Sequence, residues 1–118
     1  MRTKVQREGF AINVLFLCSQ NKRRSLTAEK IFEKHNKYSV RSAGTESNSR
    51  VKVTRGMLGW AEVIFCMEKK HVRRLQEKYK DIIGGKEIIC LNIGDDYAFM
   101  DMELVAILEC CLDKYQYE

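Results

Sequence analysis

A cysteine and an arginine, separated by five residues, follow an apolar run in the segment "VLFLCSQNKRRS", where they are Cys18 and Arg24. A thiolate is a strong nucleophile, and the planar fork of an arginine can hold two oxygens of one phosphate group. Five intervening residues are about enough to encircle a tetrahedral oxyanion with backbone N–H groups. The pair therefore predicts nucleophilic attack on phosphorus. The plainer alternative is a buried thiol followed by a solvated basic turn.

The flanking elements would bring both residues to one place. Residues 12–18 form an apolar run typical of a buried strand, and a helical pattern begins near Ser25. The first N–H groups of a helix have no partner within the helix, so a loop that closes onto a helix amino terminus attracts anions. The same field favours a thiolate. We expect Cys18 to lie at the end of a strand, beneath an anion site.

The rest of the chain alternates in the same way. Residues 62–67 and 87–93 are also strand-like, as is the shorter stretch 38–42, and residues 26–36, 68–80 and 101–115 have helical periodicity. This alternation predicts an α/β fold, a doubly wound sandwich with helices on both faces of a parallel sheet. Ligands of such folds bind at the carboxyl ends of the strands, which is where Cys18 would lie.

Length and composition narrow the class of protein. The 118 residues, 45% hydrophobic and 31% charged, predict one domain over residues 1–118 with a core over about 12–112. Residues 1–8 would be a frayed or edge extension. No run approaches the length of a membrane span and no signal peptide is recognised, so we expect a cytoplasmic protein. The net charge of +5 suits anionic substrates and weak nucleic-acid contact alike.

The five cysteines are odd in number and show no CxxC spacing. Reduced thiols are therefore expected in place of a disulfide framework or a zinc site, and no metal or cofactor is expected. Cys66 and Cys90 lie within apolar runs, as buried inert thiols commonly do.

Four motifs occur in an order that resembles the low-molecular-weight protein tyrosine phosphatases. The first is the C-x-x-N-x-x-R-S pattern of the phosphate loop, and the others are "VRSAGT", "AEVIFCMEKKHVRRL" and "DDYAFMDMELV". Together they extend from about Ile12 to Leu112, and the likeness is greatest to a short bacterial branch labelled as predicted tyrosine phosphatases. The resemblance implies a three-layer sandwich of the phosphotyrosine phosphatase I-like type, with a four-stranded parallel sheet in the order 2-1-3-4.

The resemblance also implies roles for the loop residues. Cys18 would become a phosphocysteine, Ser25 would donate a hydrogen bond to its sulfur, and Asn21 would hold a left-handed turn and bond Ser42. Arg24 and the backbone amides of the loop would bind the phosphoryl oxygens. The phosphate-binding residues would be Ser19, Gln20, Asn21, Lys22, Arg23, Arg24 and Ser25.

A general acid is needed because an oxyanion leaves poorly unless it is protonated. Asp95 aligns with the family's aspartate, but Asp96 stands where the family has proline, so either could be the acid and Asp95 is favoured. Tyr97 would supply one wall of the substrate site. The implied function is a metal-independent phosphomonoester hydrolase, a protein tyrosine phosphatase acting on a phosphorylated protein or a small aryl phosphate. We expect a monomer or weak dimer that binds neither nucleic acid nor membrane.

The chain also departs from the family's pattern. Arg23 replaces a second loop cysteine that protects the nucleophile in many members, so reversible disulfide protection should be absent. Lys22 and Arg23 could favour acidic residues beside the phosphate, or could simply be a solvated rim. Since residues 46–55 contain no aromatic side chain, phosphotyrosine specificity stays open. The two histidines, His35 and His71, are expected to be structural or exposed.

Two other functions remain possible on this fold. A thiol-dependent arsenate reductase would need further cysteines on a mobile segment, and Cys66 and Cys90 are too deeply embedded in strands to act so. A non-catalytic phosphate-binding module would need only the loop.

Overall fold

The computed structural model describes residues 11–114, in which strands and helices alternate. Residues 1–8, expected to be frayed or an edge extension, lie outside the described residues, and the single domain over 1–118 stays a prediction. No helix in residues 11–114 is long and apolar enough to cross a membrane. The elements are β1 (Ile12–Cys18), α1 (Arg24–Phe32), β2 (Tyr38–Gly44), α2 (Arg55–Trp60), β3 (Val63–Cys66), α3 (Lys69–Lys78), α4 (Lys80–Ile83), β4 (Glu87–Cys90) and α5 (Met102–Asp113).

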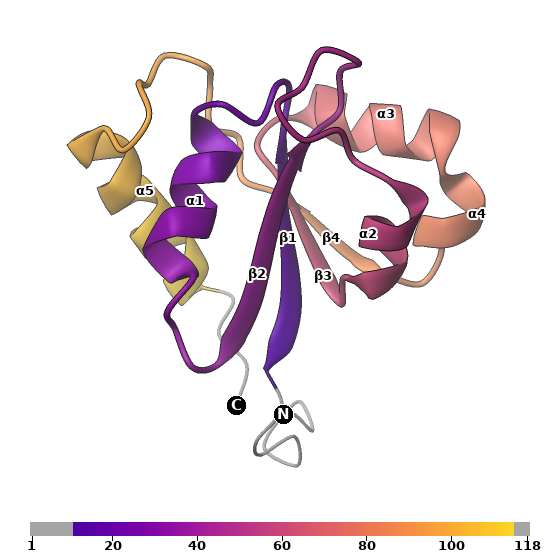
Figure 1. Ribbon diagram of the computed structural model, residues 1–118, viewed down its shortest axis with the longest axis horizontal. Helices are drawn as coiled ribbons and strands as arrows, with labels where there is room; N and C mark the ends of the chain where they lie inside the picture. The colour runs from indigo at the N-terminus through magenta and orange to yellow at the C-terminus, as the bar shows by residue number, and fades with distance from the viewer. Residues whose placement is uncertain (1–10, 115–118) are drawn as a thin grey trace.

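All four strands are parallel, in the order β2-β1-β3-β4, which confirms the predicted fold (Figure 1). β1 lies inside the sheet, paired with β2 along its whole length and with β3 from Val14 to Leu17. Its sequence is continuously apolar after Asn13 because helices cover both of its faces. This central strand ends at Cys18.

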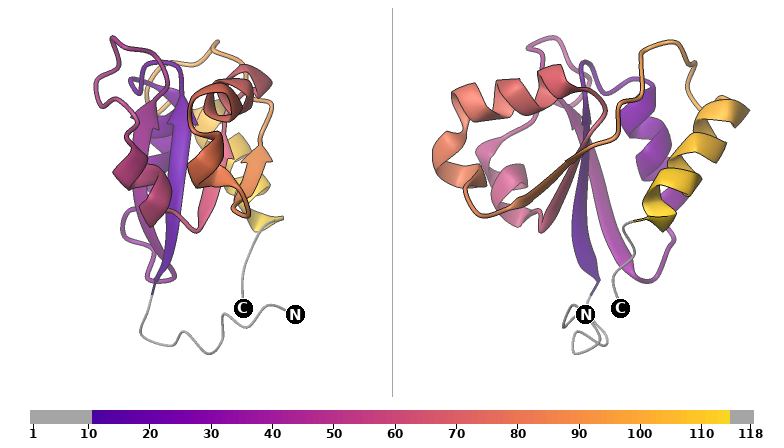
Figure 2. Two further views of the ribbon diagram at one scale, coloured as in Figure 1. Left: turned by 90° about the vertical axis from the view of Figure 1, so that its right-hand side faces the viewer. Right: turned by 180° about the vertical axis from the view of Figure 1, so that it is seen from behind.

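The helices form two layers. In Figures 1 and 2, α1 and α5 cover one face of the sheet, and α2, α3 and α4 cover the other. Successive side chains of β1 point to opposite faces, so Phe16 and Cys18 belong to the core beneath α1 and α5, whereas Leu15 and Leu17 face the other helices. Phe16 stacks on Phe32 of α1, with ring centroids 6.0 Å apart. The Cys18 side chain therefore emerges on the side of α1.

The helix α5 follows the predicted stripe. Leu104 and Leu108 are fully buried, and Ile107 and Cys111 pack against the same core. Asp101 caps the helix, accepting hydrogen bonds from the N–H groups of Glu103 (2.8 Å) and Leu104 (3.2 Å). Asp101 thus satisfies two N–H groups that the first turn of a helix leaves without a partner.

Several details differ from the sequence prediction, and a separate short helix α4 follows α3 where a single helical stretch was expected. α2 was not expected, α1 ends at Phe32, and β4 ends at Cys90. His35 therefore lies beyond α1 and is exposed, with its ring 4.7 Å from that of Tyr38. After β4 the chain stays aligned with β3, because the N–H of Ile93 donates to the carbonyl of Met67 at 2.8 Å. This extension leads to Asp95.

Candidate active site

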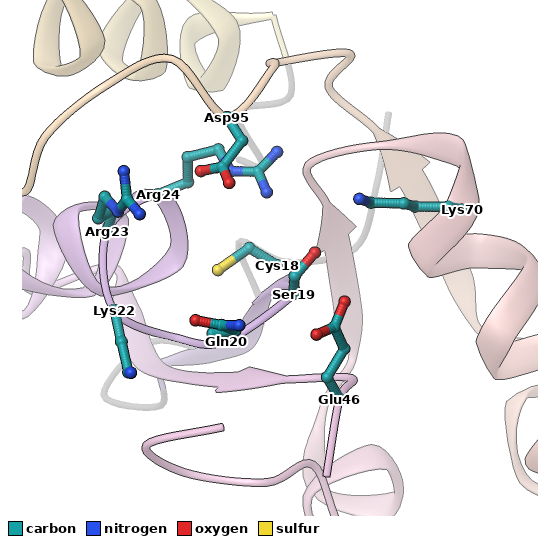
Figure 3. Close-up of a pocket in the computed structure, with 9 residues that line it drawn as sticks. All are labelled: Cys18, Ser19, Gln20, Lys22, Arg23, Arg24, Glu46, Lys70 and Asp95. Carbon is teal, nitrogen blue, oxygen red and sulfur yellow. The ribbon is translucent and has the colours of Figure 1, made fainter. Parts of the chain in front are cut away.

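A small polar pocket lies at the carboxyl end of β1. Its volume is about 190 Å³, below the ~300–1,000 Å³ typical of drug-sized ligand sites. It suits a group the size of a phosphate. Figure 3 shows the residues that line it: Cys18, Ser19, Gln20, Lys22, Arg23, Arg24, Glu46, Lys70 and Asp95.

The loop between β1 and α1 is held from outside by residues 45–50. With its carbonyl oxygens bonded to this segment, the loop is free to direct N–H groups toward the pocket, beside those of the first turn of α1. No side chain caps that turn. In each bond the acceptor is a backbone carbonyl oxygen of the loop. The N–H groups of Thr45, Glu46 and Arg50 donate to Cys18 (2.9 Å), Ser19 (3.0 Å) and Gln20 (2.9 Å), and Arg50 Nε donates to Asn21 (3.1 Å).

Gly44 permits this close approach. A Cβ atom at this position would lie 2.2 Å from Ser49 Oγ and 2.6 Å from the carbonyl oxygen of Ser19. The Ser49 hydroxyl itself donates to that carbonyl at 3.0 Å. Only glycine fits between the loop and the segment that holds it.

A buried hydrogen-bond network orients the hydroxyl next to the cysteine. Asn21 has φ 59°, the left-handed conformation predicted for it, and its Nδ2 donates to Ser25 Oγ and Ser42 Oγ, both at 2.8 Å. Ser42 in turn donates to the Glu29 carboxylate. Because Ser25 accepts from Asn21, its own hydrogen remains to be donated. The two acceptors in reach are Cys18 Sγ at 3.0 Å and the carbonyl oxygen of Ala43 at 3.4 Å, so the sulfur is the nearer one.

Arg24 is a buried cation with a free donor. Only 1% of the residue is exposed. Its Nη1 donates to the carbonyl of Ile93 at 2.7 Å and lies 3.4 Å from Glu68 Oε2. Its Nε is 3.6 Å from Asp95 Oδ1 and has no hydrogen-bond partner among the described residues. A buried guanidinium with an unfilled donor is the partner that an oxyanion requires.

Glu68 balances part of this charge. Burial opposes ionisation of its carboxyl group, but Arg24 and Lys70 outweigh burial and hold its pKa below the ordinary value. Glu68 is therefore a carboxylate that stabilises the buried Arg24.

The acid candidates differ in position. Asp95 lines the pocket beside Arg24, with 55% of its side chain exposed (Figure 3). Neither Asp96 nor Tyr97 is among the lining residues. Tyr97 packs instead against the core on the α1 and α5 face. The structure thus brings Asp95 to the pocket, and does not bring Tyr97 there.

His71 is the residue that sequence reasoning missed. It is fully buried, its Nδ1 accepts a hydrogen bond from the N–H of Glu68, and its Nε2 lies 3.0 Å from Ser19 Oγ. Burial, followed by the charge of Arg24, lowers the pKa of His71 to about 4. The available signal was helical spacing, because His71 lies one turn before Leu75, which is also fully buried.

The rim of the pocket is mainly basic. Exposed Lys22 and Arg23 extend from the loop, and Lys70 reaches over from α3 (Figure 3). With Arg24, four basic and two acidic side chains line the pocket. This charge attracts anions.

The other described cysteines lie away from the pocket. Cys66 of β3 is fully buried beside Cys90 of β4, its register partner. Burial, together with Cys90, raises the pKa of Cys66 to about 12, so this thiol stays protonated. Residues 11–114 contain no group of three or more His, Cys, Asp or Glu placed to hold a metal ion.

Residues 13–63 match the family model described as low molecular weight phosphotyrosine protein phosphatase. Similar solved structures include the YwlE arginine phosphatase from Geobacillus stearothermophilus (17% identity, TM-score 0.69, 89% of this chain and 93% of that one). Another is the tyrosine phosphatase Wzb from Escherichia coli K30 in complex with phosphate, with 14% identity and a TM-score of 0.73. The match covers 90% of this chain and 96% of that one. A third is the low molecular weight protein tyrosine phosphatase from T. tengcongensis, with 20% identity and a TM-score of 0.69. The match covers 88% of this chain and 99% of that one. No curated protein matches the sequence.

Proposed function

We propose that this protein is a phosphomonoester hydrolase, because residues 13–63 match the family model of low molecular weight phosphotyrosine protein phosphatases and solved phosphatases share its fold over 88–90% of the chain. It acts through a phosphocysteine intermediate on protein phosphotyrosine. The observation that carries the proposal is the buried Arg24, whose Nε lacks a partner among the described residues, in the same small pocket as Cys18.

In the first step Cys18 Sγ attacks phosphorus and forms a sulfur–phosphorus bond while the bond to the leaving oxygen breaks. The Ser25 hydroxyl stabilises the thiolate before the attack. Arg24 and the loop N–H groups bind the non-bridging oxygens, whose charge must be held in the transition state.

Asp95 serves both steps as acid and then base. Its carboxylic acid donates a proton to the departing oxygen, and the resulting carboxylate removes a proton from a water molecule. That water attacks phosphorus, the bond to sulfur breaks, and inorganic phosphate is released. Asp95 lines the pocket with Oδ1 3.6 Å from Arg24 Nε, so its carboxyl group lies beside the site of the phosphate. Asp96 is the weaker candidate because it does not line the pocket.

The charged rim bears on the substrate. Lys22, Arg23 and Lys70 favour phosphotyrosine with acidic residues beside it. No second thiol lines the pocket among the described residues, so nothing there supports arsenate reduction.

The test is hydrolysis of p-nitrophenyl phosphate in the presence of EDTA by wild type and Cys18→Ser. We expect at least a ~1,000-fold fall in kcat for Cys18→Ser, because the nucleophile is lost. Cys110→Ser is the matched control, since Cys110 is exposed on α5 and should leave the rate unchanged. Rapid acid quenching should trap a phosphorylated wild-type protein. Equal turnover in Cys18→Ser and wild type would refute the proposal.

A further inference from the structure

We propose that His71 is a positioning residue that fixes the Ser19 hydroxyl as a hydrogen-bond donor to the oxyanion in the pocket. This inference rests on the anion site of the proposed function. The resemblance places Ser19 in the loop whose backbone amides bind phosphate; the inference adds the Ser19 side chain as a donor and His71 as the group that orients it.

The tautomer of His71 follows from its two contacts. The backbone N–H of Glu68 donates to Nδ1 at 3.0 Å, so Nδ1 must carry a lone pair. A neutral imidazole then carries its hydrogen on Nε2. That hydrogen points to Ser19 Oγ, 3.0 Å away. His71 is therefore the donor and Ser19 the acceptor in this bond.

Ser19 is left with its own hydrogen to donate. Within residues 11–114 its hydroxyl has no other hydrogen-bond partner. Ser19 follows Cys18 directly and lines the pocket, with its hydroxyl oxygen directed toward the side on which Lys70 lies (Figure 3). A hydroxyl that already accepts a bond from the protein directs its hydrogen to the remaining acceptor, which is the bound anion.

The surroundings keep His71 neutral. It is fully buried, and burial disfavours a charged imidazole. Three nearby cations disfavour it further: Arg24 of α1, and Lys70 and Arg74 of the helix that carries His71. Together these effects outweigh the carboxylate of Glu68, which favours the charged form. Protonation would also place an N–H on Nδ1 against the N–H of Glu68. With its pKa lowered to about 4, His71 remains a single tautomer at neutral pH.

The experiment measures binding of inorganic phosphate by calorimetry at pH 7 and fixed salt. The proteins are wild type, Ser19→Ala, His71→Asn and the double variant. Asparagine retains an acceptor for Glu68 N–H but is too short to reach Ser19. A hydrogen bond to a charged group of this kind corresponds to about a 10-fold change in affinity. We expect each single variant to bind phosphate ~10-fold more weakly, and the double variant no more weakly than either.

Two further variants separate positioning from a structural effect. His71→Gln restores a longer donor and should recover part of the affinity. His35→Asn makes the same change at an exposed histidine and should bind phosphate as wild type does. ¹⁵N NMR of wild type should show His71 with hydrogen on Nε2 alone. Thermal unfolding confirms that each variant is folded.

The outcomes are distinct. Equal phosphate affinity in wild type and Ser19→Ala, additive losses in the double variant, or no phosphate binding by wild type would each overturn the inference. Phosphate binding with the expected losses, but no hydrolysis by wild type, would refute the proposed phosphatase and leave this inference standing.

Discussion

At the scale of single residues, the pocket separates two neighbouring carboxylates, of which the sequence already favours Asp95 over Asp96 as the acid. Asp95 lies 3.6 Å from Arg24 Nε and lines the pocket, whereas Asp96 does not line it. A general acid must be within reach of the leaving oxygen, so position alone favours Asp95.

Replacing Asp95 by Asn should lower kcat for aryl phosphates by about 100-fold or more, which is the usual contribution of a general acid. The loss should be greatest for the most basic leaving groups, which need protonation most. Asp96→Asn is the adjacent control and should stay within a few-fold of wild type. Steady-state kinetics with a series of substituted phenyl phosphates measures both, and a larger loss in Asp96→Asn would reverse the assignment.

Much of the site could be predicted residue by residue from the chain. Cys18, Asn21 and Arg24 are close in sequence, so their spacing already carries the geometry of the loop. His71 belongs to a helix far along the chain, within a charged segment that looks solvated, and only tertiary packing buries it. Tyr97 packs against the core and does not line the small pocket, and its role as a wall for the rest of the substrate stays a prediction.

At the scale of elements, the pocket depends on the contact between the β1–α1 loop and residues 45–50. The contact is tight because Gly44 has no side chain, and a Cβ there would overlap Ser49 and Ser19. Only such an approach lets the carbonyl oxygens of the loop be bonded from outside.

Gly44→Ala should therefore destabilise the protein by about 2 kcal/mol or more and reduce phosphate binding, because backbone atoms would have to move apart. Urea unfolding and calorimetry test both effects. Gly59→Ala is the matched control, since a Cβ at Gly59 in α2 meets nothing within 4 Å. We expect that change to be neutral or slightly stabilising. Equal stability of the two variants would contradict the role assigned to Gly44.

Elements were predictable to the extent that they carry long apolar patterns. β1 is continuously apolar and α5 has a clear stripe, and both lie where the pattern placed them. α2 has six residues, two of them glycine, so its sequence carries almost no helical signal. Its formation depends on packing, with Leu58 fully buried against the sheet.

At the scale of the whole molecule, the buried His71 links stability to pH. Burial and then Arg24 lower its pKa from 6.5 to about 4 in the folded protein. Between these values the unfolded chain binds a proton that the folded protein does not. The contribution of His71 to stability is therefore fully present above pH 6.5 and is lost as the pH falls toward 4.

Urea unfolding measures the free energy of unfolding at pH 7 and at pH 5. Between these two values wild type should lose about 2 kcal/mol more of it than His71→Asn does, because a shifted group contributes about 1.36 kcal/mol per pH unit. His35→Asn replaces an exposed histidine and should keep the wild-type dependence. Glu68 and Asp81, whose pKa values are lowered, add their losses at more acidic pH. Parallel pH dependence in wild type and His71→Asn would contradict this assignment.

The hydrogen bonds that residues 45–50 donate to the β1–α1 loop also bear on the entropy of anion binding. Ordering the backbone costs about 1–2 kcal/mol per residue, so a slack loop over residues 19–23 would subtract on the order of 5 kcal/mol or more from the affinity for its ligand. Here that entropy is lost during folding, together with the formation of the sheet. An anion that binds here would meet a loop already ordered by folding, so the cost of ordering that loop would not be subtracted from its binding free energy.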